Sequence, residues 1–559
     1  MSILRFKNAD CKNCYKCLRE CPVKAISMIN NQAQNIDDLC ILGGKCTNIC
    51  PQNAKEVINT ISNVKELLSS NKDVIASVAP SFIANFNVSN FEVLRAALID
   101  LGFKDAFETA VGAKYVDGEY IRILNIEKYP NFITSCCPSV NYLIQKYYPK
   151  ALKYLAPVDS PMVAHAKMIK KNHDCYVVFI GPCIAKKDEA HKNEAVDEAL
   201  TFVELSEMFN EKNIDLKKYS EIKATDEYNS GRFYPVDRGI IKSIKTYDPN
   251  YEYVAVSGIS ECIDFLEHID SVHGMFVEMN ACPHSCVNGP AGINSGEGCI
   301  KSIERVRKYT KNTGVNPIDV SKYDIDASKE FKAYDIDYKI PTETEIRQIL
   351  QTFGKYTKED ELNCGACGYQ TCRDKAIAVY NNKAEKEMCL PFMKEQAVSL
   401  SNEVIKNSPN GIISLDENNI ILDCNERAKV LLGIDQFVKK KNIGDVREMS
   451  DIALYLINKK AIDVNNAHIS KTKRDVEVTS VYVKNAKINF AIIRDCTLEE
   501  EHKKKLKEYR ENTINLTNSV IDKQMRTVQE IASLLGETTA ETKLAIYKLR
   551  QILIDNEGK

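Results

Sequence analysis

Clustered cysteines constrain this chain more than any other feature of its sequence. The 559 residues include 21 cysteines, most of them in short runs, whereas Trp is absent and His occurs only 8 times. The first residues, MSILRFKNADCKNC, lack the apolar run of a secretory signal, and no apolar stretch reaches the length of a membrane-spanning helix. We therefore expect a cytoplasmic protein in which clustered thiols bind metal or act in catalysis, rather than form disulfides. Thiolates favour iron–sulfur clusters over sites built mainly from imidazole.

Length and charge predict a multidomain globular protein. At about 100–200 residues per domain, a chain of this length holds roughly three to five domains. Its 44% hydrophobic and 27% charged residues allow sizeable buried cores. A formal net charge of −2 argues against binding to nucleic acid or to an anionic membrane surface.

Two cysteine runs open the chain. The first, Cys11-x2-Cys14-x2-Cys17-x3-Cys21-Pro22, has the spacing of bacterial ferredoxins, in which the last cysteine of each run ligates the other cluster. A zinc knuckle is disfavoured by this spacing. Gly43 stands where the second cluster needs a ligand, so that cluster is either [3Fe-4S] or a [4Fe-4S] cluster closed by water or another ligand. The predicted ligands are Cys11, Cys14, Cys17 and Cys50 for the first cluster, and Cys21, Cys40 and Cys46 for the second.

Between about residues 64 and 308, apolar runs alternate with segments of helical periodicity. The runs DVIASVAP, DCYVVFIGPC and YEYVAVSG predict strands, whereas NFEVLRAALIDLG and NYLIQKYYPKALKYL predict helices. This alternation indicates an α/β domain with parallel strands, whose carboxyl ends carry the site. Thiols that converge from separate loops there would form a buried metal site. The cysteines that follow predicted strands are Cys136, Cys137, Cys183, Cys282 and Cys286.

Three of these segments carry a family resemblance. ITSCCPSV (133–140), FIGPCIAKKDEA (179–190) and FVEMNACPHSCVNGPAG (276–292) resemble, in order and spacing, the three signature loops of the [FeFe]-hydrogenase catalytic domain. The resemblance implies an H-cluster, a [4Fe-4S] cubane joined through a cysteine sulfur to a di-iron unit with CO, cyanide and azadithiolate ligands. It implies that Cys286 is the shared thiolate. The implied cubane ligands are Cys137, Cys183, Cys282 and Cys286.

The resemblance also implies roles for residues near the cofactor. Cys136 would carry protons, for which a thiol is suited, although the same residue could be a small buried hydrophobe. Lys186 would pair with a cyanide ligand, and Glu119 would belong to the family's proton path. Ala156 interrupts that path where a serine is expected, and Gly181 and Asn280 replace methionines, so we expect slow turnover. The residues implied to line the cofactor are Ala79, Pro80, Ser81, Ser160 and Pro161.

A third metal motif follows, Cys364-x2-Cys367-x4-Cys372-x16-Cys389. It resembles the small [4Fe-4S] domain of anaerobic redox proteins, and its final cysteine is predicted to return from a helix, AIAVYNNKAEKE. Zinc is the alternative, because four cysteines also suit that ion, but this is not the usual paired CxxC spacing. The remaining cysteines lack cluster spacing and are interpreted as structural: Cys175, Cys262, Cys299, Cys424 and Cys496.

After Leu400 the chain changes character. NSPNGIISLDENNIILDCNERAKVLLGID resembles the start of a PAS sensory domain, DVEVTSVYVK and KINFAIIRD predict two later strands, and Asp495-Cys496-Thr497 resembles the junction from a PAS domain into a signalling helix. The PAS ligand is unknown; His468 could ligate haem, but a lone histidine is more often an ordinary surface residue. The tail is predicted to be helical, with a break at Gly536 and a capping box from Thr538 to Glu541.

These patterns predict a multidomain α/β protein. Its expected parts are a 2[4Fe-4S] ferredoxin-like domain (1–60), an α/β iron-hydrogenase H-cluster domain with parallel sheets (64–310), a linker (311–345), a small helical [4Fe-4S] domain (346–398), a PAS α+β domain (400–497) and a helical signalling or dimerisation tail (498–559).

The leading hypothesis is a sensory [FeFe]-hydrogenase of low turnover. It would interconvert H2 with protons and electrons and relay hydrogen or redox state through about three further Fe–S clusters to the PAS domain. The expected partners are a redox carrier such as ferredoxin, H-cluster maturation proteins, a downstream signalling protein and a second copy of the chain. The alternative is a non-catalytic iron–sulfur redox sensor, or an assembly-type protein that lacks the di-iron unit.

Overall fold

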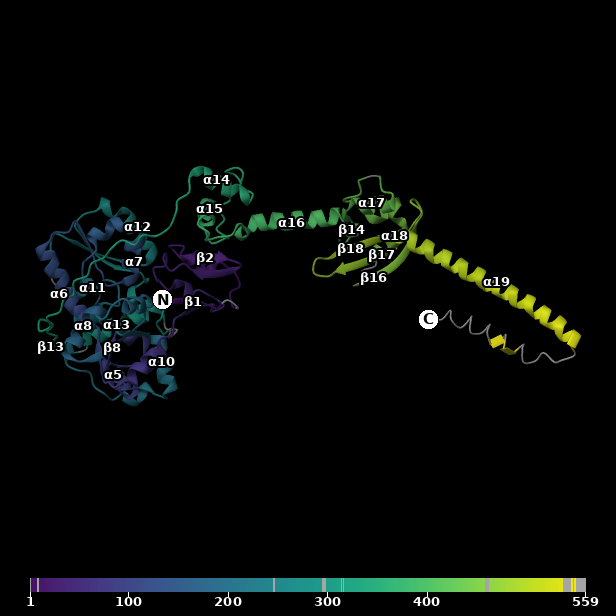
Figure 1. The fold of residues 1–559 in the computed structure, drawn as a ribbon. Helices are drawn as coiled ribbons and strands as arrows, with labels where there is room; N and C mark the ends of the chain where they lie inside the picture. The colour runs from purple at the N-terminus through teal and green to yellow at the C-terminus, as the bar shows by residue number, and fades with distance from the viewer. Residues whose placement is uncertain are drawn as a thin grey trace. The chain divides into compact units, whose positions relative to one another are not determined.

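The computed structural model describes residues 2–7, 10–244, 247–293, 298–312, 314, 316–435, 437–457, 462–535, 544–545 and 547–548. The chain divides into two compact units, Met1–Met393 and Lys394–Lys559. Figure 1 shows helices and strands in both units. In the described part of the chain, no helix is both long and apolar enough to cross a membrane.

The first unit opens with short elements around the ferredoxin-type cysteines. Strand β1 (Leu4–Phe6) pairs antiparallel with β4 (Lys55–Val57), and β2 (Ile26–Ile29) pairs antiparallel with β3 (Gln32–Asn35). Asn30 and Asn31 form the β2–β3 turn with φ values of 52° and 57°, as a two-residue hairpin loop requires. The short helices α1 (Lys16–Glu20) and α2 (Lys45–Asn48) carry Cys17 and Cys46.

Two parallel sheets form the centre of this unit, as the alternating sequence pattern predicts. One has the order β6-β5-β8-β9 and the other the order β11-β12-β7. Helices flank both, and α6 (Ala110–Ile126) packs against α8 (Pro161–Asn172). The strands are β5 (Asp73–Val78), β6 (Asp105–Glu108), β7 (Asn131–Ile133), β8 (Cys175–Gly181), β9 (Glu198–Thr201), β11 (Glu252–Ser257) and β12 (Met275–Asn280).

The other helices around these sheets cover their faces and connect their ends (Figure 1). Their bounds are α3 (Ile61–Leu68), α4 (Phe82–Asn85), α5 (Phe91–Leu101), α7 (Pro138–Tyr147), α9 (Ala185–His191), α10 (Phe202–Glu211), α11 (Gly239–Ile244), α12 (Ile259–His268) and α13 (Cys299–Asn312), with 3-10 turns that include Pro149–Tyr154, Ser230–Phe233 and Ser285–Asn288.

One predicted helix is divided in the structure. The periodic segment 141–155 predicts a single helix, but α7 ends at Tyr147 and a separate 3-10 turn runs from Pro149 to Tyr154. Proline has no backbone N–H to continue the α-helical hydrogen bonds, so Pro149 can only start a new turn.

The third cysteine motif is a small helical module that contacts the ferredoxin-like segment. It contains α14 (Glu343–Thr352), α15 (Cys372–Tyr380) and a 3-10 turn, Lys386–Met388. Helix α15 is shorter than predicted, because the chain turns at Asn382, where φ is 54°. The Lys24 Nζ donates to the Gly368 carbonyl at 3.0 Å, which joins the two segments.

The second unit contains a five-stranded antiparallel sheet of order β15-β14-β18-β17-β16, preceded by α16 (Leu390–Lys406). Strand β16 was not predicted, since its sequence DVNNAHI is polar; along it, exposed residues alternate with partly buried ones. Sheet and helices enclose one apolar core. The elements are β14 (Gly411–Leu415), β15 (Ile421–Cys424), α17 (Glu426–Leu432), α18 (Ser450–Ile457), β16 (Asp463–Ile469), β17 (Arg474–Val483) and β18 (Ile488–Asp495).

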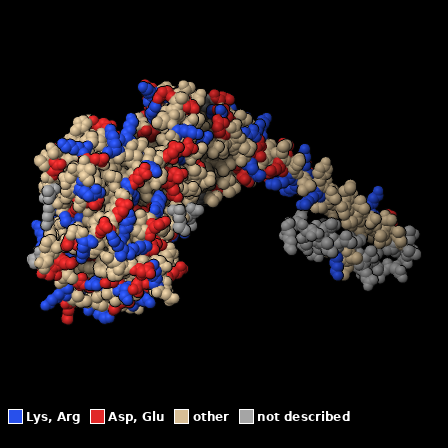
Figure 2. All heavy atoms as spheres, turned by 60° about the vertical axis from the view of Figure 1, so that its left-hand side comes forward, with Lys and Arg blue, Asp and Glu red and all other residues tan. Residues whose placement is uncertain are grey.

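A long helix, α19 (Thr497–Leu535), follows the sheet. At its start, the Thr497 Oγ1 donates to the Asp495 Oδ1 at 2.7 Å, and the Arg474 Nη1 donates to the Asp495 Oδ2 at 2.6 Å. The predicted break at Gly536 and the capping box from Thr538 to Glu541 lie outside the described residues. Figure 2 shows Lys and Arg intermixed with Asp and Glu on the face in view, in line with the near-zero net charge.

Candidate active site

A buried cavity lies beyond the carboxyl ends of the strands in the first unit. Its volume is about 100 Å³, and Cys136, Cys137, Cys183 and Cys286 all line it, together with Lys186. The structure thus brings together thiols from the three sequence segments that resemble signature loops. Other cavity-lining residues that the sequence singled out are Ala79, Pro80, Ser81, Pro161 and Asn280.

The loops that carry the thiols are positioned by their strands. Cys137 is the residue before α7, with Pro138 at the first helical position, and Cys183 lies between β8 and α9. Gly181, at the end of β8, permits a close approach: a Cβ there would lie 2.8 Å from the Phe179 ring and 3.1 Å from the Ala79 Cβ. The glycine that replaces a family methionine therefore lets two strand ends pack tightly beside the cavity.

Cys282 belongs to the same group of thiols, although it is not among the cavity-lining residues. Burial raises the pKa of the Cys282 thiol well above its ordinary value, and neighbouring Cys183, Cys286 and Cys137 raise it further. Burial likewise raises the pKa of Cys183 to about 11. Four neighbouring, partly buried thiols cannot all ionise here without a cation among them, and iron that binds their thiolates would supply that charge.

A buried hydroxyl in the cavity wall is suited to a bound polar group. The Ser81 Oγ lies in the cavity wall, and it is buried with no hydrogen-bond partner among the described residues. A buried hydroxyl normally has a partner, so this donor is available to a bound group. Among the described residues, no group of three or more His, Cys, Asp or Glu side chains is arranged to hold a single metal ion.

Cys136 is held by a tyrosine that the sequence interpretation missed. The Tyr120 OH lies 3.1 Å from the Cys136 Sγ, and the Ser135 N–H donates to the same hydroxyl at 3.0 Å. Burial raises the pKa of the Cys136 thiol to about 12, while the Tyr120 hydroxyl lowers it. Cys136 is therefore a protonated thiol with a fixed orientation, facing the cavity.

Lys186 reaches the cavity as part of a buried charge group. Its Nζ donates to the Glu189 Oε2 at 2.6 Å and to the Cys136 carbonyl at 3.3 Å. Ser160, implied by the sequence to line the cofactor, instead donates to Glu189 at 3.0 Å, and Lys329 pairs with Glu189 at 3.2 Å. Burial lowers the pKa of Lys186, but the Glu189 carboxylate outweighs burial and raises it overall. Two lysines around one carboxylate leave a positive charge beside the cavity.

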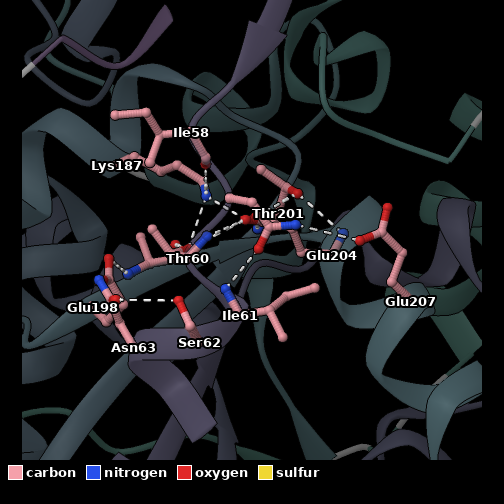
Figure 3. A network of polar contacts seen from close by, with 12 residues as sticks. Ile58, Thr60, Ile61, Ser62, Asn63, Lys187, Glu198, Thr201, Glu204 and Glu207 are labelled. Atoms are coloured by element: carbon pink, nitrogen blue, oxygen red, sulfur yellow. Dashed lines mark hydrogen bonds and ion pairs between the residues drawn. The ribbon is translucent and has the colours of Figure 1, made fainter. Parts of the chain in front are cut away.

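The neighbouring Lys187 points away and anchors α9. Figure 3 shows its Nζ among polar groups of the segment that leads from the ferredoxin-like part into α3. It donates to the Ile58 carbonyl at 2.8 Å, to the Thr60 Oγ1 at 2.8 Å and to the Glu204 Oε1 at 2.7 Å. The two adjacent lysines thus lie on different faces of α9, one toward the cavity and one fixed to the fold.

Glu119 and Ala156, which the resemblance relates to the proton path, do not line the cavity. The Glu119 carboxylate accepts from Arg122 at 2.7 Å on the outer side of α6 and does not line the cavity. Ala156 is fully buried in the apolar cluster that also contains Tyr120 and contacts Cys136. On α6 the residue that reaches Cys136 is Tyr120, which is adjacent to Glu119 and therefore about 100° around the helix.

Three of the ferredoxin-type cysteines lie around one site, while the ligand set Cys11, Cys14, Cys17 and Cys50 stays a prediction. Cys21, Cys40 and Cys46 line one small cavity with Gly43. A Cβ at Gly43 would lie 2.6 Å from the Ile259 Cδ1 of α12, so a larger residue there would displace that side chain. The space that a side chain at position 43 would need is thus taken by Ile259.

The third motif places a lysine beside its thiols. Lys375 is 1% exposed, donates to the Lys386 carbonyl at 2.8 Å and interacts electrostatically with Cys389, Cys367 and Cys372. Burial lowers the pKa of Lys375, and these cysteines oppose that shift. A buried cation among cysteines suits an anionic iron–sulfur cluster.

Comparison with known proteins agrees with this geometry. Residues 72–290 match the family model described as iron only hydrogenase large subunit, C-terminal domain. The chain contains an iron-only hydrogenase domain. Residues 360–391 match a family model for an Fe–S cluster, and residues 400–468 match a PAS domain. The hydrogenase domain therefore coexists with iron–sulfur and PAS modules, as the sequence resemblance predicted.

Individual relatives of the hydrogenase domain are distant. Iron hydrogenase 1 of Clostridium pasteurianum is 25% identical over 297 residues, which cover 41% of this chain and 52% of that protein. The periplasmic [Fe] hydrogenase large subunit of Nitratidesulfovibrio vulgaris is 24% identical over 271 residues, 38% of this chain and 64% of that protein. The cytosolic Fe-S cluster assembly factor NAR1 of Kluyveromyces lactis is 25% identical over 210 residues, 34% of this chain and 43% of that protein.

The chain thus spans about half the length of the first of these relatives. Among solved structures, a variant of an [FeFe]-hydrogenase from Chlamydomonas reinhardtii aligns with 49% of this chain and 91% of that one, at 17% identity and a TM-score of 0.37.

The PAS unit gives no support to a haem ligand at His468. This side chain is 59% exposed, and its Nδ1 lies 2.7 Å from the Asp475 Oδ1 across the β16–β17 pair. His468 is on the surface of an edge strand, away from the core enclosed by the sheet.

Proposed function

We propose that this chain is a PAS-linked, sensory [FeFe]-hydrogenase that interconverts H2 with protons and electrons. The observation that carries the proposal is the single buried cavity where Cys137, Cys183 and Cys286 meet Cys136 and Lys186. Four cubane thiolates account for Cys137, Cys183, Cys282 and Cys286. A free thiol and a lysine at the same cavity have roles only if a further, anionic group binds beside the cubane.

In this proposal the chain's own residues hold and serve the H-cluster. When bound, that cofactor supplies the iron centre at which H2 is split or formed. Lys186 offsets the negative charge of its cyanide ligands, and Glu189 fixes the direction of the ammonium. Ser81 offers a hydroxyl to the bound group. Cys136, oriented by Tyr120, gives and takes the proton at its Sγ. The apolar wall, with Ala79, Pro161 and Phe179, keeps bulk water out.

Electrons would pass through the accessory iron–sulfur clusters to a redox carrier such as ferredoxin. The ferredoxin-like thiols and Cys367 pack around the same apolar cluster, which includes Leu18 and Tyr369. This shared packing supports an electron route between the ferredoxin-like clusters and the third cluster. We assign that cluster to Cys364, Cys367, Cys372 and Cys389.

The PAS domain and α19 would report the redox state to a downstream protein. Leu506, Tyr509 and Leu516 of α19 are 56%, 71% and 70% exposed. Such an apolar surface along a helix suits a homodimer seam. Low turnover is compatible with a signalling role, because the oxidation state of the site carries the information.

The alternative is a non-catalytic iron–sulfur protein without the di-iron unit. Its support is the 25% identity to the assembly factor NAR1, which is as high as that to the hydrogenases. Cys136 and Lys186 favour the hydrogenase proposal, since a cubane alone uses neither.

Infrared spectroscopy distinguishes the two functions. The full chain would be purified anaerobically with its iron–sulfur clusters and loaded with the di-iron cofactor. The hydrogenase proposal expects bands of metal-bound CO and cyanide, together with H2-dependent dye reduction that falls sharply in Cys136→Ala. A protein with complete iron–sulfur content and no such bands would be the non-catalytic alternative.

A further inference from the structure

A second polar group besides Lys186 reaches the cavity, and neither the sequence motifs nor the proposed function account for it. Tyr234 lines the cavity, and its OH donates to the Asp117 Oδ1 at 2.7 Å. Asp117 lies on α6, one turn before Tyr120, and is fully buried. A carboxylate this deeply buried is costly to keep and usually serves a purpose.

The other oxygen of Asp117 leads toward solvent. Its Oδ2 accepts from the Ser243 Oγ at 2.5 Å and from the Lys114 Nζ at 3.2 Å. The Lys114 side chain is 24% exposed, and its Nζ also donates to the Ser243 carbonyl at 3.0 Å. The hydrogen-bonded chain therefore begins at a cavity-lining phenol and ends at an ammonium group that water can reach.

We propose that Tyr234, Asp117 and Lys114 form the proton route between the cavity and solvent. The inference rests on the proposed hydrogenase function, since only a reaction that makes or consumes protons needs such a route. It assigns relay roles to three residues, and it replaces the path through Glu119 that the family resemblance implies.

At each step of the relay, one bond to hydrogen breaks and another forms. Inward, an N–H bond of Lys114 breaks as an O–H bond forms at the Asp117 Oδ2, and Lys114 regains a proton from water. The carboxyl group then rotates, and its new O–H bond breaks as one forms at the Tyr234 oxygen. The phenol's own O–H bond breaks in the same step, and that proton passes to the Cys136 Sγ, which has already given its proton to the bound group. Rotation of the carboxyl group and the phenol O–H restores the starting arrangement. Outward transfer reverses these steps.

Two neighbouring groups, Tyr120 and Glu278, do not lead to solvent through hydrogen bonds of the described residues, although burial also raises the pKa of Glu278 to about 7. The Tyr120 OH contacts Cys136, but its other partner, the Ser135 Oγ, donates to the Val158 carbonyl at 2.7 Å, which cannot pass a proton on. The buried carboxylate of Glu278 accepts from the Gly239 and Ile241 N–H groups, each at 3.1 Å. Backbone amides do not exchange protons on the timescale of a relay.

The acidity of Asp117 supports the assignment. Burial raises the pKa of Asp117 to about 6, while the groups that face it, Lys114, Ser243 and Tyr234, oppose that shift. A carboxyl group with a pKa near neutrality can both accept and release protons under working conditions. This does not hold for an ordinary surface aspartate.

Two variants and one matched control test the route. In the loaded full chain, Asp117→Asn keeps the size of the side chain but cannot carry a proton, and Tyr234→Phe removes only the hydroxyl. We expect H2-coupled dye reduction to fall at least about 100-fold in the first and about 10-fold in the second, in the range of general acid–base effects. Asp159→Asn is the control, because Asp159 is also buried, pairs with Lys167 at 2.7 Å and does not line the cavity. It should retain near wild-type activity, and the CO and cyanide bands should be present in all samples.

A second readout uses the unloaded protein and separates this inference from the proposed function. Infrared difference spectra of the wild type should show the signal of a carboxyl group that titrates near pH 6. This signal should be absent in Asp117→Asn. In Tyr234→Phe it should titrate at higher pH, because the carboxylate has lost a hydrogen-bond donor. Full activity of Asp117→Asn with intact cofactor bands, or no carboxyl titration that this variant removes, would overturn the route. If wild-type protein has the cofactor bands but no activity, the hydrogenase proposal fails, and the titration still decides whether the hydrogen-bonded chain exists.

Discussion

The cavity of the hydrogenase domain and the two accessory cysteine segments differ in how much of their thiol set is exposed. Around the cavity, burial raises the pKa of Cys136 and Cys183, and charged side chains are paired in the interior. In the accessory segments, burial likewise raises the pKa of Cys17, to about 11, but Cys14 and Cys364 are exposed. Chemistry on protons and a gas needs a dry site with few, fixed polar groups, whereas electron exchange needs clusters near the surface. The difference suggests that changes around the cavity act through buried charge and that changes in the accessory segments act through electron supply.

Loss of a cavity thiolate should have the largest effect. Cys286→Ala removes the thiolate that the proposal shares between the cubane and the di-iron unit, so H2-coupled dye reduction should fall below detection. Cys364→Ser should cost one accessory cluster, measured as iron content, with a partial loss of activity. Cys424→Ser, in the PAS unit and outside both regions, is the control for loss of a thiol. Equal losses of activity in the first two variants would contradict the comparison.

The next effect concerns stability. Glu189→Gln leaves Lys186 and Lys329 without their shared carboxylate, and an uncompensated buried charge costs about 3–5 kcal/mol of unfolding free energy. Denaturant unfolding of the first unit measures this loss. The matched change at a surface ion pair, Glu211→Gln opposite Lys65, should cost far less, since both side chains are half exposed. A Glu189→Gln protein as stable as wild type would show that the charge group is not buried as described.

The histidine contribution to acid sensitivity should belong to the hydrogenase domain rather than to the accessory segments, since residues 1–60 and 343–398 contain no histidine. Burial lowers the pKa of His165 from 6.5 to about 3, and its Nδ1 lies 2.7 Å from the Ser77 Oγ. The unfolded chain therefore binds a proton below pH 6.5 that the folded chain does not. The unfolding free energy should fall by about 1.4 kcal/mol per pH unit below pH 6.5.

Unfolding curves at pH 6.5 and 5.5 measure that slope. His165→Gln should remove this contribution, whereas His468→Gln, at an exposed edge strand, serves as the control. A slope that His165→Gln leaves unchanged would contradict the assignment of a buried neutral imidazole.

The smallest expected effect is at the start of α19, outside both regions. Asp495→Ala removes an acceptor for Thr497 and Arg474, which should destabilise the PAS unit by about 1–2 kcal/mol. Thermal unfolding of the PAS unit measures the change. Activity of the loaded hydrogenase domain should be unaffected, and a loss of activity would show that this junction acts on the cavity.

Much of the site could be predicted from sequence because it follows strand ends. Cys137, Cys183 and Cys286 come directly after apolar runs, and parallel strands deliver such positions to one edge. Tyr234 and Asp117 could not be predicted in this way. Tyr234 follows a 3-10 turn and Asp117 lies on a helix, neither segment carries a sequence motif, and only tertiary packing brings the two residues together. Glu189 had a usable signal: it lies three residues after Lys186, the spacing of an ion pair on one helix face.

The role of Glu119 stays a prediction. A helix turns by 100° per residue, so Glu119 pairs with Arg122 while its neighbour Tyr120 contacts Cys136. Strand β16 was missed because an edge strand exposed to solvent shows little apolar alternation.

The most direct test of the central claim is infrared spectroscopy of the full chain after loading with the di-iron cofactor. The account predicts bands of metal-bound CO and cyanide that shift when H2 is admitted, in wild type but not in Cys286→Ala. Protein with a full complement of iron–sulfur clusters, yet without these bands or with bands that ignore H2, would contradict it.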